Sequence, residues 1–301
     1  MTRRKTMKNL DVHKVRRRVA TGSAVTIGLA LLAGCGTAAG DAAESDTVTA
    51  KRDAGHVHTV AINPADGLTY LGTHGGLLQI DGDQATWVGP QIDLMGLVAV
   101  GPDHFYASGH PGEGAGLPDP VGLIESRDGG ETWTPLSRQG KSDFHTLAAS
   151  ETGVVGFDGA LRSSADGHAW QDVTIPREPY ALTSSTSGDV LLATTPEGPL
   201  RSPDAGATWQ EIESAPLLQF VDWVSGDDVV GVDPEGAVWT SADAGLTWEA
   251  GSALPTGAVA MSAAPVHGGP AEIVAVSEGR LWRSTDGGGL FVSAPIPTPE
   301  A

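Results

Sequence analysis

The 301-residue chain is short of cysteine, and it has few aromatic and few charged residues. Its single cysteine excludes a disulfide scaffold and a zinc finger or ribbon. An uncharged stretch at residues 19–34 is too short for a comfortable transmembrane span. Glycine and proline, at 41 and 20 residues, interrupt every window long enough for a sustained helical period. What remains is a glycine-rich, all-β globular protein.

Basic residues are scarce beyond the start of the chain. There are 18 Lys and Arg against 37 Asp and Glu, and residues 1–34 hold eight of the basic residues and one acid. The rest of the chain is therefore more acidic than the overall net charge of −19 suggests. Such a surface repels phosphate backbones, so we expect no nucleic-acid partner. It suits solubility outside a cell and attracts cations.

The first 35 residues have the pattern of an export signal. Three arginines at 16–18 precede the uncharged stretch, which ends in small residues. The segment Leu32-Ala33-Gly34-Cys35 resembles the lipobox of bacterial lipoproteins. The resemblance implies cleavage before Cys35, lipidation of its thiol and anchoring at the extracytoplasmic face of the cell membrane. The arginines also partly match a twin-arginine export signal.

An eight-residue motif, Ser-x-Asp-x-Gly-x-Thr-Trp, recurs along the rest of the chain. Three copies are complete, two are degenerate and one is reduced to its final Thr-Trp. The aromatic residues that close the six copies are Trp87, Trp133, Trp170, Trp209, Trp248 and Phe291. Periods near forty residues with strand signals are typical of a propeller or a solenoid.

Each repeat contains four short strand signals. In the fifth repeat we expect strands at 219–224, 228–232, 237–241 and 247–250. One such unit cannot bury both faces alone, so six units are expected to close into a six-bladed β-propeller. The expected domains are a signal peptide at 1–34, a flexible tether at 35–54 and the propeller at 55–301.

The repeated motif resembles the Asp box, or BNR repeat. Ser and Asp oxygens can accept backbone N–H groups within a turn, and Gly supplies a positive φ. The closing Trp can then pack between neighbouring blades. Sialidases and other glycosidases, sortilin-type receptors and photosystem assembly factors share this motif. In those families the boxes lie opposite the active site, so the resemblance implies a fold and not an activity.

Bacterial lipoproteins of this type are often classed as sialidase-like glycosyl hydrolases. Sialidases use three arginines, a Tyr nucleophile paired with Glu, and an Asp acid/base, with a Phe/Tyr-Arg-Ile-Pro motif that this chain lacks. The candidates for such chemistry here are Tyr180, Glu197 and Arg177. A glycoside hydrolase is therefore one alternative to a ligand-binding module. An envelope protein–protein scaffold is another, and it has no residue signature.

Histidine gathers at one rim of the expected propeller, where the first strand of a blade starts and its second strand ends. The histidines there are His56, His58, His74, His110 and His145. The second blade has Met95 where the first and third blades have histidine. A long Gly/Pro-rich insertion at residues 109–122 lies on the same rim, and such loops are commonly functional.

Several imidazoles with a thioether suit copper and, less exclusively, zinc in an exported protein. The expected metal ligands are His58, His74, Met95, His110 and His145. With His56, the same histidines could instead line a cleft for a small polar ligand or a glycan. A third interpretation has the imidazoles fill small gaps at the starts of the blades.

Overall fold

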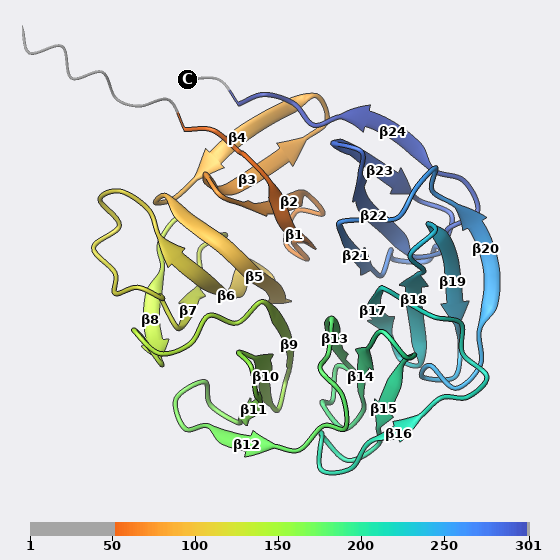
Figure 1. The fold of residues 1–301 in the computed structure, drawn as a ribbon. Coiled ribbons are helices and arrows are strands. Elements are labelled where there is room, and N and C mark those ends of the chain that lie inside the picture. Colours follow the sequence, from red (N-terminus) through yellow and green to blue (C-terminus); the bar gives the residue numbers. More distant parts are fainter. Residues whose placement is uncertain (1–51, 300–301) are drawn as a thin grey trace, which may run out of the picture. The chain divides into compact units, whose positions relative to one another are not determined.

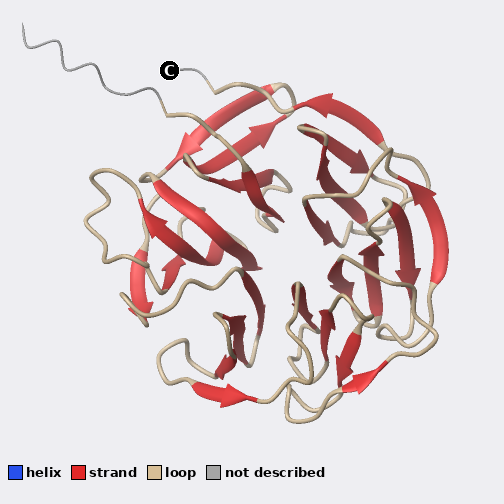
Figure 2. Ribbon diagram, viewed as in Figure 1, coloured by secondary structure: helices blue, strands red, loops and turns tan. Residues whose placement is uncertain are grey.

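Residues 52–299, which the computed structural model describes, form six four-stranded antiparallel sheets arranged in a ring (Figure 1). The part of the chain that is described contains strands and loops but no helix (Figure 2). In every sheet the four strands follow one another along the chain. The six-bladed β-propeller predicted from the repeats is therefore confirmed.

Each blade places its first strand at the centre of the ring and its fourth strand at the edge. The first strands are β1 (Val57–Ile62), β5 (Ile92–Gly101), β9 (Thr146–Ser150), β13 (Ala181–Ser184), β17 (Phe220–Ser225) and β21 (Ala260–Ala264). The second strands are β2 (Thr69–Thr73), β6 (His104–Pro111), β10 (Gly153–Phe157), β14 (Leu191–Thr194), β18 (Asp228–Val232) and β22 (Glu272–Ser277).

The outer half of each blade consists of the third and fourth strands, some of which have only two or three residues. The third strands are β3 (Gly76–Asp81), β7 (Leu123–Ser126), β11 (Leu161–Ser164), β15 (Leu200–Ser202), β19 (Ala237–Ser241) and β23 (Arg280–Ser284). The fourth strands are β4 (Gln84–Val88), β8 (Thr134–Ser137), β12 (Gln171–Val173), β16 (Gln210–Glu211), β20 (Glu249–Ala253) and β24 (Val292–Pro295).

The hydrophobic core lies between blades and not within any one of them. In blade one, Leu71 of the second strand and Leu78 of the third strand pack with Val274 of blade six. This contact closes the ring. Among residues 52–299 no strand is exchanged between the first and last blades. The motif aromatics occupy the same layer. Trp133 packs against the core shared by blades one and two, and Trp209 packs against the core shared by blades three and four.

Hydrogen bonds also join the innermost strands across the blade boundaries. Thr146 Oγ1 accepts a hydrogen bond from the Leu182 amide at 3.0 Å. The Trp223 amide donates to Thr183 Oγ1 at 3.0 Å in the next blade along. These bonds link β9 to β13 and β13 to β17, and they hold the inner strands of these blades in register with one another.

The repeated motif forms a tight turn between the third and fourth strands. In the copy at residues 202–209, Ser202 Oγ accepts the Gly206 N–H at 2.7 Å and donates to Asp204 Oδ1 at 2.9 Å. Asp204 accepts both the Thr208 amide and the Thr208 hydroxyl at 2.7 Å. These hydrogen bonds lower the pKa of the Asp204 carboxyl. The polar side chains of the motif therefore form hydrogen bonds within the turn itself.

Substitution Ser202→Ala is expected to lower the free energy of unfolding by about 1–3 kcal/mol, because it leaves the buried Gly206 N–H without an acceptor. Urea denaturation of the purified protein measures the change. Thr174→Ala removes a hydroxyl from an exposed residue and serves as the control, with an expected change below about 0.5 kcal/mol. Equal effects of the two substitutions would contradict the structural role of the motif serine.

The predicted signal peptide, Cys35 and most of the tether lie outside the described residues. The last tether residues, 52–54, are described, and Arg52 contacts the first blade. Its Nε donates to the Gly75 carbonyl at 2.9 Å, and its guanidinium lies 4.8 Å from the centre of the Trp87 ring. Among residues 52–299 there is no helix of the length and apolarity needed to cross a membrane.

Candidate metal-binding site

The first group of site residues comes from three elements of blades one and two. His58 lies in β1 at a bulge between Val57 and Thr59, and such bulges re-aim a side chain. His74 directly follows β2, where β2 turns toward β3, and Asp93 lies near the start of β5. The antiparallel pairing of β1 with β2 brings the two histidines together.

We call His58, His74 and Asp93 the His58 cluster. One ligand atom from each residue can be chosen so that all three lie within 4.8 Å of one another. The His74 Nδ1 atom is 2.8 Å from Asp93 Oδ2, and the His58 Nε2 atom is 3.4 Å from Asp93 Oδ1. The two imidazole rings meet edge-on, with centroids 4.4 Å apart.

Two buried atoms of the His58 cluster, His58 Nε2 and Asp93 Oδ1, face each other at 3.4 Å and have no hydrogen-bond partner. Burial lowers the pKa of His58, opposed by the Asp93 carboxylate and assisted by the neighbouring histidines. The His58 imidazole is therefore neutral at neutral pH and has a lone pair available. Neutral imidazole and carboxylate are the forms in which these side chains bind metal ions.

A second group of residues joins blades two and three, and we call His110, Asp143 and His145 the His110 cluster. The Nε2 atoms of His110 and His145 lie 3.1 and 2.7 Å from the same oxygen, Asp143 Oδ2. On its other side, His110 Nδ1 is 2.6 Å from Asp119 Oδ1, in the long insertion. His110 is the register partner of Asp93 in the β5–β6 ladder, so the two clusters are neighbours.

Charges within the His110 cluster shift its pKa values in the directions expected for ion pairs. The hydrogen bond to Asp119 raises the pKa of His110 against the opposing effect of burial. The hydrogen bond to Asp143 likewise raises the pKa of His145. Burial alone would raise the pKa of Asp143, but the two histidines lower it overall. Asp143 therefore stays ionised between its two imidazoles.

The structure divides the histidines that the sequence analysis treated as one set. His58 and His74 are in the first cluster, and His110 and His145 are in the second. His56 is adjacent to the first, with its ring centroid 5.5 Å from that of His74.

Met95 makes no hydrogen bond to any of these side chains and sits in a bulge of β5 between Leu94 and Gly96. The β5 side chain that contacts the two histidines of the first cluster is Asp93. Sequence reasoning also missed Asp119 and Asp143. Proximity in the chain was the available signal, since Asp93 is two residues from Met95 and Asp143 is two residues from His145.

Among the three candidates for sialidase-like chemistry, Arg177 and Glu197 contact each other, and Tyr180 has other partners. The Tyr180 hydroxyl accepts a hydrogen bond from Gln219 Nε2 at 3.1 Å, and its ring packs edge-on against Phe220. Arg177 Nε is 3.7 Å from Glu197 Oε2. Tyr180 lines the central cavity, whereas Arg177 and Glu197 do not.

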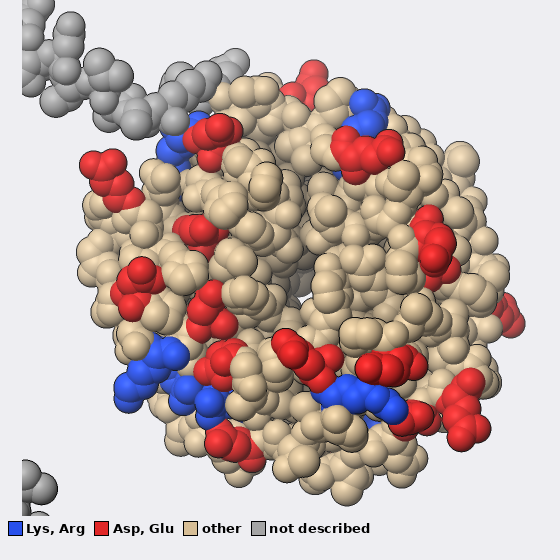
Figure 3. All heavy atoms as spheres, viewed as in Figure 1, with Lys and Arg blue, Asp and Glu red and all other residues tan. Residues whose placement is uncertain are grey.

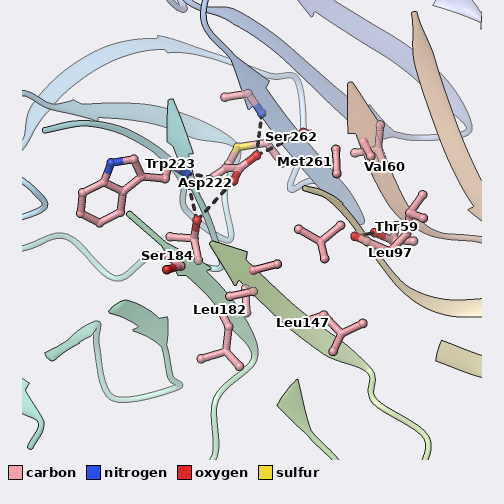
Figure 4. A pocket seen from close by; sticks show the side chains of 18 of the residues that line it. Thr59, Val60, Leu97, Leu147, Leu182, Ser184, Asp222, Trp223, Met261 and Ser262 are labelled. Carbon is pink, nitrogen blue, oxygen red and sulfur yellow. Dashed lines mark hydrogen bonds between the residues drawn. The ribbon is translucent and has the colours of Figure 1, made fainter. Parts of the chain in front are cut away.

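The central cavity has a volume of about 370 Å³ and is lined by the innermost strands of all six blades. Its lining includes His58, His145 and Tyr180, so the rim clusters border it. Deeper in the cavity wall, Asp222 accepts hydrogen bonds from Ser262 and from the Ala263 amide (Figure 4). Burial raises the pKa of Asp222 to about 6, although these hydrogen bonds lower it.

Figure 3 shows one face of the ring, hollowed at its centre, with acidic side chains spread around the hollow. No model of a protein family matches the sequence, and no curated protein matches it. Similar solved structures define the class of protein as a β-propeller.

One of these structures is an ancestral GH74 enzyme, with a TM-score of 0.52 and 13% identity over 80% of this chain and 38% of that one. Another is the extracellular domain of BT4673 from B. thetaiotaomicron, described as a hybrid two-component system, with a TM-score of 0.53 and 13% identity. That match covers 82% of this chain and 34% of the other. YCF48 bound to D1 peptide gives a TM-score of 0.45 at 18% identity, covering 68% of this chain and 69% of that one. This chain therefore spans less than half the length of the first two, and at these identities the likeness concerns the fold alone.

Proposed function

We propose that this chain is an exported, lipid-anchored propeller that binds a divalent transition-metal ion at the His58 cluster. The observation that carries the proposal is the convergence of two imidazoles and one carboxylate from three separate elements, within 4.8 Å of one another. Export and anchoring rest on the lipobox-like segment that ends at Cys35. The repeats that resemble Asp boxes would then serve only to build the fold that carries this site.

The donor types favour zinc or copper(II). Imidazole suits both ions, and a carboxylate is a common third ligand of zinc. The three residues of the His58 cluster supply nitrogen and oxygen ligands, which suit zinc and copper(II) better than copper(I). A bound cation would also supply the partner that His58 Nε2 and Asp93 Oδ1 lack.

Three protein ligands leave at least one coordination position for water or for a small polar ligand or glycan. Such a ligand would approach from the central cavity, because His58 belongs to its lining. In this proposal the propeller is a binding module. The metal ion would coordinate the ligand, and the dimensions of the central cavity would limit the size of the ligand. The acidic surface would assist by raising the local concentration of cations.

The His58→Ala substitution tests the proposal. The full chain, purified in detergent and stripped with a chelator, is titrated with zinc chloride and copper(II) chloride by calorimetry. We expect tight binding by the unmodified chain and at least a tenfold weaker affinity at this site after His58→Ala or Asp93→Asn. His267→Ala, an exposed histidine without a hydrogen bond, is the matched control and should bind as tightly as the unmodified chain. Unchanged affinity in both His58→Ala and Asp93→Asn would refute this site.

A further inference from the structure

We infer that Arg52 and Gly55 are positioning residues of the metal site. They hold His74 in place for the ion, so that docking of the end of the predicted tether on blade one is coupled to metal binding. The inference rests on the proposed function, because His74 is one of the three ligands proposed there. The contacts of Arg52 and Gly55 with the blade belong to the fold, so the docking can be measured without metal.

Arg52 lies in a slot at the rim of blade one. Its Nε atom donates to the Gly75 carbonyl at 2.9 Å, and its Nη1 atom donates to the Gly89 carbonyl at 3.2 Å. The guanidinium also lies 4.8 Å from the centre of the Trp87 ring, within the range of a cation–π interaction. Gly75 is in the turn between β2 and β3, and Gly89 directly follows β4. One side chain of the tether therefore connects two loops of the blade.

Two successive glycines make room for this docking. A Cβ atom at Gly75 would collide with the carbonyl oxygen of Asp53. A Cβ atom at Gly76 would collide with the Arg52 guanidinium. The backbone and the arginine side chain of the tether therefore both lie directly on the β2–β3 turn. His74 is the first residue of that turn, so Arg52 fixes the segment that carries this ligand.

The next residues of the tether contact His74 itself, as the chain runs inward to β1 (Figure 1). The His74 amide donates to the His56 carbonyl at 3.3 Å. Gly55 has a φ of 57°, and a Cβ atom there would lie 3.2 Å from both Cβ and Cδ2 of His74. A larger residue at position 55 would therefore push against the imidazole.

His74 is the member of the His58 cluster that most needs such support. Its side chain is 47% exposed, against 17% for His58 and 24% for Asp93. An exposed side chain loses rotamer freedom when it binds an ion, and this loss weakens binding. Contacts that restrict His74 beforehand reduce that cost. Because coupling between two binding events is reciprocal, an ion that fixes His74 must in turn stabilise the docked tether.

The Gly55→Ala substitution tests the effect on the ion. The full chain, purified in detergent and stripped with a chelator, is titrated with zinc chloride by calorimetry. We expect the zinc affinity to fall about tenfold, the usual lower value for loss of a group that supports a metal ligand. Gly82→Ala is the matched control, because Gly82 has a φ of 60° in the same blade and a Cβ atom there has no neighbour within 4 Å. It introduces similar backbone strain away from the site and should bind zinc as tightly as the unmodified chain.

The Arg52→Ala substitution tests the docking. Hydrogen–deuterium exchange followed by mass spectrometry reports on the amides of His74 and Gly75, both of which are hydrogen-bonded. In metal-free protein we expect these amides to exchange faster in Arg52→Ala, because the turn opens more often. Zinc should slow their exchange in the unmodified chain, and Arg52→Ala should also bind zinc more weakly.

Arg280→Ala is the control for the loss of charge. Arg280 is in β23 of blade six and donates to Ser293 Oγ, so its replacement removes the same charge away from the slot. The zinc affinity and the exchange of the β2–β3 turn should stay unchanged in this variant.

The inference and the proposed function fail in different ways. If Arg52→Ala and Gly55→Ala both bind zinc as tightly as the unmodified chain, the inference is overturned and the His58 cluster remains the metal site. If the unmodified chain binds no zinc, the proposed function and the coupling are refuted together. Faster exchange in metal-free Arg52→Ala would then show that Arg52 only braces the turn.

Discussion

Substitution Phe144→Ala is expected to lower the free energy of unfolding by about 3–5 kcal/mol, the usual cost of removing a fully buried aromatic side chain. The Phe144 ring is completely buried and stacks on Trp170 with centroids 4.9 Å apart. It fills the space above Gly156, where even a Cβ atom would approach the ring to 2.7 Å.

The same substitution should disturb the rim, because Phe144 lies between Asp143 and His145 in the chain. Its amide donates to Ser108 Oγ at 2.9 Å, which fixes the backbone of this segment on blade two. Urea denaturation measures the stability, and Phe144→Leu is the control. Leucine keeps much of the apolar volume, so its expected cost is smaller than that of alanine. A loss below about 1 kcal/mol in Phe144→Ala would show that this residue does not anchor the segment.

The difference in unfolding free energy between Asp222→Asn and the wild type is expected to change with pH. Between pH 4 and pH 7 it should shift in favour of the variant by up to about 3 kcal/mol. Burial raises the pKa of Asp222 to about 6 in the folded protein, against about 3.9 in an unfolded chain. The folded state therefore binds this proton more tightly. The protonated Asp222 carboxyl therefore contributes fully to the free energy of unfolding below about pH 4, and this contribution is lost as the pH rises through about 6.

Asparagine cannot ionise, so the Asp222→Asn variant does not lose this stabilising contribution as the pH rises. Urea denaturation of both proteins at pH 4, 5, 6, 7 and 8 gives the difference in unfolding free energy, and the other titrating groups cancel in that difference. Asn can still accept the Ala263 amide, which Asp222 Oδ2 binds at 2.8 Å. Asp228→Asn, the same change at an exposed position of β18, is the matched control. A flat difference for Asp222→Asn would mean that its carboxyl titrates normally.

The strands of the fifth repeat show how closely the repeat pattern predicts the fold. The expected strands at 228–232 and 237–241 coincide with β18 and β19. The expected fourth strand began at residue 247, whereas β20 begins at Glu249. The reason is local: the Thr247 amide and hydroxyl bond to Asp243 within the motif turn, which keeps Thr247 out of the ladder.

For the candidate site, the repeats also predicted which histidines belong to the same rim. They could not divide those histidines into two clusters. Carboxylates are common in this acidic chain, so the nearness of Asp93 to Met95 and of Asp143 to His145 along the chain was too weak a signal to separate them from the other acids. Their importance depends on the ladder that pairs Asp93 with His110 and on the loop that brings Asp143 beside both His110 and His145.

The amino-acid order by itself determined the number of blades, the motif turns and the rim that carries the histidines. It did so because strand alternation and turn chemistry act over a few residues and repeat at a regular period. Only the tertiary structure decided which donors meet, because those contacts cross blade boundaries and depend on bulges of one residue in β1 and β5. A shift of one residue changes the direction of a side chain, and the spacing of repeats does not encode such a shift.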